Sequence, residues 1–268
     1  MPATSRPRIT VRSQIPAATR IVVKVGSSSI SGENAHQIET LVDALAEAHA
    51  RGAEVVLVSS GAIATGIPYL KLDHRPTDLA TQQAAAAVGQ NALIYRYQES
   101  LDRYSIVAGQ VLLTAGDLEN PTPRANAQRA MDRLLELRIL PIVNENDTVA
   151  THEIRFGDND RLAALVARLI GADLLVLLSD VDAIYTKPPL EPGAEPIHHI
   201  AFGDPLDGVI FGEAGSGVGT GGAGTKVAAA QIATEAGTPV LMTSAALVSE
   251  ALRGSDIGTW FAASETAL

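Results

Sequence analysis

The stretch Ile21-Val22-Val23-Lys24-Val25-Gly26-Ser27-Ser28 has the pattern of a buried β-strand that runs into a turn of small residues. Its apolar residues are nearly continuous rather than alternating with polar ones, which is typical of a parallel strand covered on both faces. Similar runs recur along the chain, at Glu54–Ser59, Ser105–Leu113, Ile139–Val143, Leu174–Leu178 and Pro239–Met242, with a further candidate at Thr259–Ala262. Together they predict a central sheet of mainly parallel strands.

Helical patterns occupy the segments between these strands. Apolar residues recur at helical spacing over Ile38–Leu45 and again over Leu162–Leu169, and each pattern is followed by a glycine that can end the helix. Further helices are expected at Leu79–Tyr97, at Ala125–Arg138 and from Lys226 to Gly237. The alternation of strands and helices predicts an α/β fold in which helices cover both faces of the sheet.

The composition is that of a globular, acidic protein. The 268 residues carry a formal net charge of −10, 46% of them are hydrophobic, and none is cysteine. The lack of cysteine excludes disulfides and thiolate metal sites, and the acidic balance disfavours nonspecific binding to nucleic acid. No apolar run reaches the ~20 residues that a membrane span needs. A cytoplasmic location fits these features.

One domain is expected, over residues 20–262, with a tail at 1–19 and another at 263–268. The N-terminal region carries four arginines, Arg6, Arg8, Arg12 and Arg20, before the first acidic residue, Glu33. This pattern has some similarity to an organelle transit peptide, but a solvated tail is the preferred interpretation. Residues 187–224 are rich in glycine and proline and are expected to form an irregular excursion from the domain.

The loop Gly219-Thr220-Gly221-Gly222-Ala223-Gly224-Thr225-Lys226 precedes the last long helix. Glycines let backbone N–H groups gather around an anion, and a helix N-terminus and a lysine add positive charge, so the loop suits a polyphosphate. It is not a Walker A sequence, because Thr225 precedes Lys226, and its match to the dinucleotide fingerprint lacks a strand directly before it. A flexible linker is the simpler alternative. Only four lysines stand against sixteen arginines, and Lys24 and Lys226 both lie at such loops.

Polar side chains gather where predicted strands end. A polar segment follows each of four predicted strands: Lys24–Ser29, Ser59-Ser60-Gly61, Asn144-Glu145-Asn146-Asp147 and Ser179-Asp180. Ligands of parallel sheets bind beyond the carboxyl ends of the strands, so these loops are expected to form a single active site.

Two of these loops differ in the ligand that they suit. Ser59-Ser60-Gly61 lacks the frame of a nucleophile elbow and is interpreted as a loop that binds a carboxylate through hydroxyl and N–H groups, with a simple strand-to-helix cap as the alternative. Two acidic and amide-rich loops, Asn144–Asp147 and Gly157-Asp158-Asn159-Asp160, suit a ligand with an ammonium group or a hydrated Mg²⁺. Part of the second loop is also explained by capping of the helix that follows it. The histidines show no consistent metal-ligand spacing.

With these residues assembled, the chain resembles the amino-acid kinase family, and within it the glutamate 5-kinase branch, from about Arg20 to Phe261. The segments that carry the resemblance are Val23–Ser28, Val58–Ile63, Ala86-Ala87-Val88-Gly89-Gln90, Val143–Ala150, Gly157–Asp160 and Gly219–Lys226. The resemblance implies an αβα sandwich around a mainly parallel sheet. It implies transfer of the γ-phosphoryl group of ATP, with Mg²⁺, to the side-chain carboxylate of L-glutamate, as the first step of proline biosynthesis.

The resemblance also implies roles for individual residues. Lys24 and Lys226 would neutralise the transferring phosphoryl group, and Asp160 would orient these lysines. Ser60, Asp147 and Asn159 would hold glutamate. The nucleotide would be held by Lys24, Ser179, Asp180, Thr220, Gly221, Gly222, Ala223, Gly224, Thr225 and Lys226. The ligands of the metal stay unassigned.

Family members typically form dimers or tetramers and are inhibited by proline, so both properties are expected here. Many bacterial members carry an RNA-modification-type (PUA) domain after the kinase domain, and none is expected within these 268 residues. Ala223 stands where the family loop usually has a bulky residue. The motifs expected to bind the acceptor keep the family's pattern.

Three other functions remain as alternatives. The nearest is another small-acceptor kinase of the family, such as an acetylglutamate kinase, although an acetylated amine would not call for the acidic Asp147. A nucleotide-binding regulator without catalysis could have lost both lysines and Asp160, which are retained. An NAD-dependent oxidoreductase would need its glycine fingerprint after the first strand, and that strand is followed by no such motif.

Overall fold

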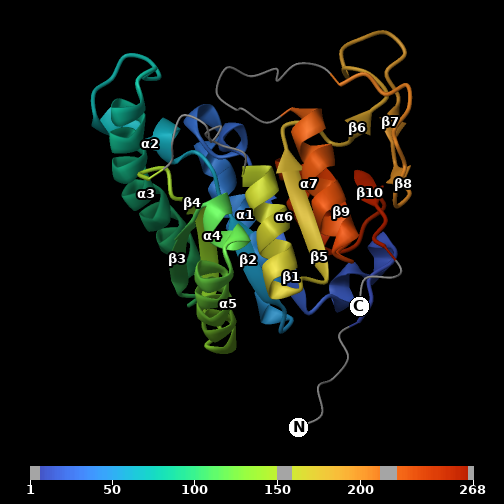
Figure 1. The fold of residues 1–268 in the computed structure, drawn as a ribbon, viewed down its shortest axis with the longest axis horizontal. Coiled ribbons are helices and arrows are strands. Elements are labelled where there is room, and N and C mark those ends of the chain that lie inside the picture. Colours follow the sequence, from blue (N-terminus) through green and yellow to red (C-terminus); the bar gives the residue numbers. More distant parts are fainter. Residues whose placement is uncertain (1–6, 150–158, 212–221, 265–268) are drawn as a thin grey trace.

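An eight-stranded sheet forms the centre of the computed structural model, which describes residues 7–149, 159–211 and 222–264. The strand order is β3-β4-β2-β1-β5-β9-β10-β8 (Figure 1). The bounds are β1 Arg20–Val25, β2 Glu54–Val58, β3 Ala108–Leu113, β4 Leu140–Glu145, β5 Leu174–Ser179, β8 His199–Ile200, β9 Val240–Ser244 and β10 Thr259–Phe261. In the described chain the pairing of β10 with β9 is antiparallel and the other pairings of this sheet are parallel. The prediction of a mainly parallel sheet is confirmed.

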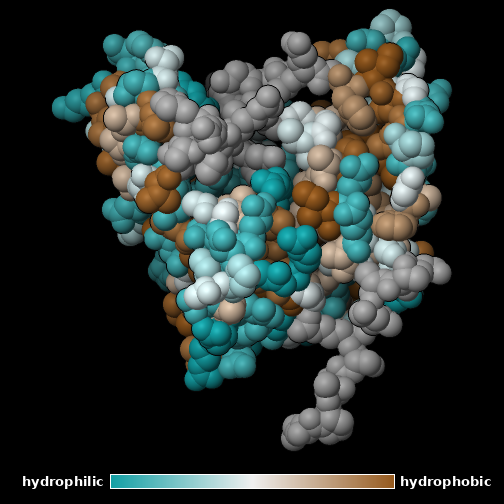
Figure 2. All heavy atoms as spheres, in the orientation of Figure 1, coloured by the Kyte–Doolittle hydropathy of each residue, from teal (hydrophilic) through white to brown (hydrophobic). Residues whose placement is uncertain are grey.

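Helices cover both faces of the sheet, as predicted. One core contains residues of α1 (Gln37–Ala50), α3 (Leu79–Asp102) and α8 (Val248–Leu252). The core on the opposite face contains residues of α4 (Ala115–Glu119), α5 (Pro121–Glu136), α6 (Asn159–Ile170) and α7 (Ala223–Glu235). Mainly hydrophilic residues cover the outer side of α5 (Figure 2). In the described residues, no helix combines the length and the apolarity that crossing a membrane requires.

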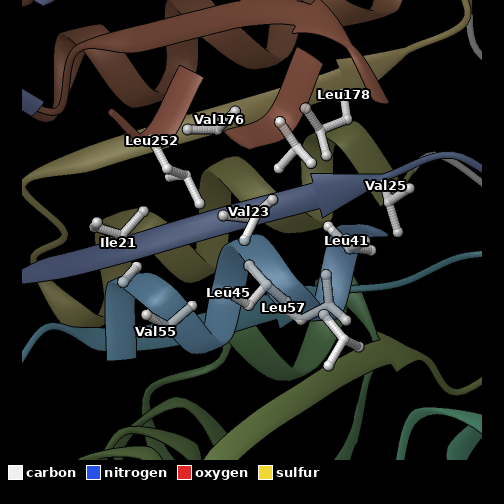
Figure 3. Packing of buried hydrophobic residues seen from close by; sticks show 14 of the residues in the cluster. Ile21, Val23, Val25, Leu41, Leu45, Val55, Leu57, Val176, Leu178 and Leu252 are labelled. Carbon is white, nitrogen blue, oxygen red and sulfur yellow. The ribbon is translucent and has the colours of Figure 1, made fainter. Parts of the chain in front are cut away.

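Strand β1 is buried along its whole length, and its two faces contribute to different cores. Ile21, Val23 and Val25 pack on one face with residues of α1, including Leu45 (Figure 3). Val22 packs on the other face, beneath α6. Since side chains alternate along a strand, Lys24 shares the face of Val22 and is directed toward α6.

Helix α2 (Ala62–Tyr69) lies against α3 at very short range, and glycines permit this contact. A Cβ on Gly89 would lie 1.7 Å from the carbonyl oxygen of Ala62, and one on Gly66 would lie 1.9 Å from that of Ala85. Real Cβ atoms do not approach a carbonyl oxygen so closely. The two helices therefore form a tightly packed hairpin that begins directly after the Ser59-Ser60-Gly61 loop.

The structure differs from the sequence-based expectation in several places. Asn144 and Glu145 end strand β4 rather than lying in the loop that follows it. Strand β3 begins at Ala108 and not at Ser105, because Ser105 has a positive φ in the turn after α3. Helices α2, α4 and α8 were not predicted. Strand β6 (Ile184–Tyr185), just before the excursion 187–224, and strands β7 (Pro196–Ile197) and β8 within it were not predicted either. These elements are all eight residues or shorter, so their periodicity is too brief to detect.

The described part of the expected N-terminal tail packs against the domain instead of lying in solvent. A 3₁₀ helix spans Arg12–Ala17, and Ile15 within it is fully buried in the core beside α8. The Arg12 guanidinium donates to the carbonyls of Ile257, at 2.8 Å, and Gly258, at 3.0 Å. The interpretation of residues 7–19 as a solvated tail is therefore wrong, because it did not take account of the apolar residues between the arginines.

Candidate active site

The predicted site residues gather at the carboxyl ends of β1, β2, β4 and β5. These four strands are neighbours in the sheet, with β1 between β2 and β5. The chain leaves β1 through α1 on one face and enters β5 through α6 on the other, so the two connections diverge at this point. Such a divergence leaves a crevice beyond the strand ends, where ligands of open α/β sheets bind.

Three charged side chains from three elements meet in this crevice. Lys24 of β1 places its Nζ 2.5 Å from Asp160 Oδ1, and Lys226 of α7 places its Nζ 3.1 Å from Asp160 Oδ2. All three residues are buried, with 4%, 6% and 2% of Lys24, Lys226 and Asp160 exposed, respectively. Asp160 stands in the first turn of α6, so the helix itself fixes the carboxylate between the two lysines.

The balance of charge in this triad is positive. Burial alone would raise the pKa of Asp160, but the charges of Lys24 and Lys226 outweigh it and lower the pKa, so the carboxylate is ionised. Two ammonium groups then face one carboxylate in a site with little access to water. Removing charges from water is costly unless they are compensated. A surplus of one positive charge therefore favours an anionic ligand at this position.

Asn159, next to Asp160, links the site to the loop after β2. Its Nδ2 lies 2.9 Å from Ser60 Oγ, 3.0 Å from the Ser59 carbonyl and 3.1 Å from Asn144 Oδ1. The Oδ1 of Asn159 and the Nδ2 of Asn144 are buried and have no hydrogen-bond partner among the residues that the structure describes. Buried polar atoms are rarely left without a hydrogen bond, so this acceptor and this donor are available to a polar ligand.

The loop after β2 adds backbone donors to this polar pocket. Gly61, with a φ of +91°, is the N-cap of α2, and no side chain caps the helix. The first N–H groups of a helix lack partners within it and carry partial positive charge. The loop thus offers the Ser60 hydroxyl and the helix N–H groups as hydrogen-bond donors, and such donors can bind a carboxylate.

Asp147 lies just beyond β4 and is mostly buried. Burial, and after it repulsion from Glu145, raises the pKa of Asp147 to about 7, against a lowering by Arg75. A carboxylate that is costly to ionise in the empty site gains stability when a cation binds beside it. An ammonium group is such a cation.

The expected nucleotide residues lie on the other side of the lysines. Ser179 ends β5, and its hydroxyl donates to the exposed Asp180 carboxylate at 3.0 Å. Gly222 is the N-cap of α7 without a side-chain capping bond, and a Cβ on Gly224 would meet no atom of another described segment within 4 Å. Ala223 and Thr225 lie in the first turn of α7, and Thr225 Oγ1 donates to the Gly222 carbonyl at 2.9 Å. Thr220 and Gly221 lie outside the described residues, as does Asp158.

Sequence reasoning gave no individual role to three side chains of this neighbourhood. Asn144 contacts Asn159, and Tyr97 contacts Ser59 through a hydrogen bond of 2.9 Å between their hydroxyls. Arg75, in the turn between α2 and α3, acts electrostatically on Asp147. Asn144 lies in the motif Asn144–Asp147, in which a binding role was assigned to Asp147 alone. Tyr97 and Arg75 carried no local signal, because the packing of α3 and the course of the segment between α2 and α3 bring them to the site.

The described residues contain no group of three histidine, aspartate or glutamate side chains that could bind a metal ion by themselves. Both oxygens of Asp160 contact lysines. Asp180, exposed beside the nucleotide residues and hydrogen-bonded to Ser179, has a carboxylate of the type that binds Mg²⁺ together with phosphate oxygens. The residues present therefore fit a Mg²⁺ ion that binds together with a nucleotide. Phosphate oxygens and water would supply most of its ligands.

Comparison with known proteins agrees with this geometry. The model of the amino acid kinase family matches residues 19–244. The glutamate 5-kinase of Clavibacter sepedonicus is 76% identical over 251 residues, which cover 94% of this chain and 97% of that protein. The glutamate 5-kinase of Leifsonia xyli subsp. xyli is 76% identical over 259 residues, 96% of each chain.

A solved structure shares the fold at much lower identity. The carbamate kinase from Giardia lamblia bound to AMP-PNP aligns with a TM-score of 0.66 and 17% identity, over 93% of this chain and 100% of that one. The expected αβα sandwich is thereby confirmed.

Proposed function

The chain belongs to the amino acid kinase family, and we propose that it transfers the γ-phosphoryl group of ATP to the side-chain carboxylate of L-glutamate. A carboxylate oxygen of glutamate attacks the γ-phosphorus, the bond to the β,γ-bridging oxygen breaks, and glutamyl 5-phosphate and ADP result. The relatives named glutamate 5-kinase, at 76% identity over nearly the whole chain, support this assignment. The product places the reaction at the start of proline biosynthesis.

The buried Lys24–Asp160–Lys226 triad carries the proposal. A carboxylate is already ionised at neutral pH, so its attack needs no general base. The obstacle is repulsion between an anionic nucleophile and an anionic phosphoryl group, and charge that grows on the phosphoryl oxygens needs fixed compensation. Two buried ammonium groups held by one carboxylate supply that compensation before the substrates arrive.

Glutamate would bind between the loop after β2 and the end of β4. The Ser60 hydroxyl and the N–H groups at the start of α2 would hold one carboxylate, and the unpartnered amide atoms of Asn144 and Asn159 would complete the pocket. Asp147 would pair with the free ammonium group. An N-acetylated substrate lacks that charge, so the buried acid favours free glutamate over N-acetylglutamate.

ATP would bind across the start of α7 and the end of β5. Its phosphates would meet Lys24, Lys226, Thr225 and the N–H groups of Gly222, Ala223 and Gly224, and Thr220 and Gly221 would extend this cradle. Ser179 and Asp180 would contact the rest of the nucleotide. Mg²⁺, bound to the phosphates, would supply further positive charge to the transferring group.

Product trapping tests the proposal. Purified protein is mixed with ATP, Mg²⁺ and hydroxylamine, and with L-glutamate, N-acetylglutamate, aspartate or carbamate as the acceptor. We expect ADP release and hydroxamate formation with L-glutamate alone, because only an acyl phosphate reacts with hydroxylamine in this way. Turnover with N-acetylglutamate instead would overturn the role of Asp147. ATP binding without turnover of any acceptor would favour a nucleotide-binding regulator.

Feedback inhibition by proline, a homo-oligomeric assembly and a cytoplasmic location complete the proposal. The outer face of α3 supports the assembly, because the helix has no charged residue from Leu79 to Tyr95, and Val88 and Tyr95 are exposed on it. Light scattering after gel filtration measures the assembly, and a proline titration of the hydroxamate assay measures the inhibition. A monomer, or activity unchanged by proline, would contradict the respective part.

A further inference from the structure

A fully buried tyrosine lies behind the loop that we assign to the acceptor carboxylate. The chain has five tyrosines, and Tyr97 is the one with no solvent exposure, whereas Tyr95, two residues away on α3, is 66% exposed. The hydroxyl of Tyr97 lies 2.9 Å from Ser59 Oγ. A buried hydroxyl is costly without a partner, so the position of Ser59 satisfies Tyr97, and Tyr97 in turn holds Ser59.

The direction of these hydrogen bonds follows from the acceptors available. Ser59 Oγ also lies 3.3 Å from the carbonyl oxygen of Ser60, which can only accept. Burial raises the pKa of Tyr97, so its phenol keeps its proton and can donate. The arrangement that satisfies all three atoms runs from the Tyr97 hydroxyl to Ser59 Oγ, and from the Ser59 hydroxyl to the Ser60 carbonyl.

This chain of hydrogen bonds fixes the peptide between Ser60 and Gly61. A trans peptide is planar, with its carbonyl and its N–H on opposite sides. Turning the Ser60 carbonyl back toward Ser59 and Tyr97 therefore turns the Gly61 N–H away from them. On the other side, Asn159 Nδ2 reaches the Ser59 carbonyl and the Ser60 hydroxyl. The loop is held between α3 and α6.

We propose that Tyr97 is a positioning residue that preorganises the Ser59-Ser60-Gly61 loop for the acceptor carboxylate. Tyr97 touches neither substrate and acts through Ser59. The identity of the ligand rests on the proposed function, whereas the ordering of the loop does not. A loop held in its binding conformation before the ligand arrives avoids the cost of ordering it on binding.

Tyr97→Phe tests this role by removing one hydroxyl and keeping the ring. We expect the KM for glutamate to rise about tenfold, equivalent to ~1.4 kcal/mol, with the KM for ATP changed less than twofold. Tyr95→Phe is the matched control on the same helix and should leave both constants unchanged. Tyr104→Phe loses an exposed hydrogen bond to Asp43 of α1 and controls for a general loss of stability.

Hydrogen exchange supplies a readout that does not depend on activity. Peptides that cover residues 59–63 should exchange faster in Tyr97→Phe than in the wild type, and this change should be absent in Tyr104→Phe. Unchanged exchange over 59–63 would overturn the proposal even if the wild type proves not to phosphorylate glutamate. If the wild type forms no hydroxamate, the proposed function is wrong. Hydrogen exchange over residues 59–63 then still decides whether Tyr97 orders the loop.

Ser59→Ala provides a second route if Tyr97→Phe folds poorly. It removes the middle atom of the chain of hydrogen bonds and should reproduce the rise in the KM for glutamate. If both side chains act through one hydrogen bond, the double variant should be no worse than the more impaired single variant. Additive effects, or equal rises in KM for glutamate and ATP, would reject the positioning role.

Discussion

Asp160 divides its two carboxylate oxygens between two lysines from different elements, so each lysine depends on the acid for its position. Loss of one lysine leaves Asp160 paired with a single ammonium group and removes the surplus positive charge. The effect on the reaction should be large because the compensating charge is buried and fixed. The effect on folding should be smaller, since the remaining pair is neutral.

Lys226→Ala should lower kcat at least a hundredfold, as expected for loss of a preorganised group worth about 2.7–4 kcal/mol in the transition state. The measurement is steady-state hydroxamate formation at saturating ATP and glutamate. Lys187→Ala, in the excursion before α7, is the control and should retain wild-type kcat. A Lys226→Ala enzyme with near-native kcat would contradict the assignment.

Asp147→Asn should raise the KM for glutamate far more than the KM for ATP, because the ammonium group loses its counter-charge. In the wild type, the kcat/KM for glutamate should rise between pH 6 and 8 with a midpoint near the pKa of Asp147, about 7. Nucleotide phosphates also titrate near pH 6, so the profile of Asp147→Asn separates the two effects. The same midpoint in both proteins would exclude Asp147 as its source.

Asp147 should also weaken the fold at neutral pH. Its pKa is raised in the folded protein from 3.8 to about 7, so the folded state binds the proton more tightly than the unfolded state. The stability contributed by this group is therefore present below pH 3.8 and is lost as the pH rises through 7. Asp147→Asn should increase Tm more at pH 8 than at pH 4, and an equal change at both values would contradict this origin.

At the scale of elements, the α2–α3 hairpin couples packing to the site. Gly89→Ala would place a Cβ 1.7 Å from the Ala62 carbonyl, at the residue that starts α2. The helices would have to separate, at a cost of ~1–3 kcal/mol, and the loop before α2 would move with them. Urea unfolding should show the lower stability, and kinetics should show a raised KM for glutamate.

Gly116→Ala is the matched control for this substitution. A Cβ at Gly116 in α4 would lie 3.6 Å from Thr114 Oγ1, an ordinary contact. It should leave stability within about 1 kcal/mol of the wild type, because alanine favours helix over glycine by about that much. Equal stability of the two variants would argue against the close crossing of α2 and α3.

At the scale of the whole molecule, the segment before β1 is part of the core. Ile15→Ala removes a fully buried side chain beneath α8 and should lower the free energy of unfolding by about 2–5 kcal/mol. Val11→Ala, at a position that is 50% exposed, should cost much less. Chemical unfolding distinguishes the two, and similar small losses would mean that the segment is dispensable for the fold.

Much of this molecule could be predicted from local pattern. Continuous apolar strands such as Leu174–Leu178 indicated a doubly covered sheet, and helices such as α6 followed from spacing and a closing glycine. The polar motifs at strand ends indicated one site, because parallel strands end at the same edge. These inferences succeed because burial on two faces and helical periodicity leave their marks within a few neighbouring residues.

Contacts between distant residues were decided by the tertiary structure alone. Nothing local places Tyr97 behind Ser59, joins Asn144 to Asn159 or buries Asp147. The burial of Ile15 likewise depends on α8, more than 200 residues further along the chain. The sequence by itself determined the alternation of elements and the chemical types of the site residues. The distances between these residues and their balance of charge arise only when the packing of helices on the sheet brings separate segments together. The same holds for the buried amide atoms that have no partner among the described residues.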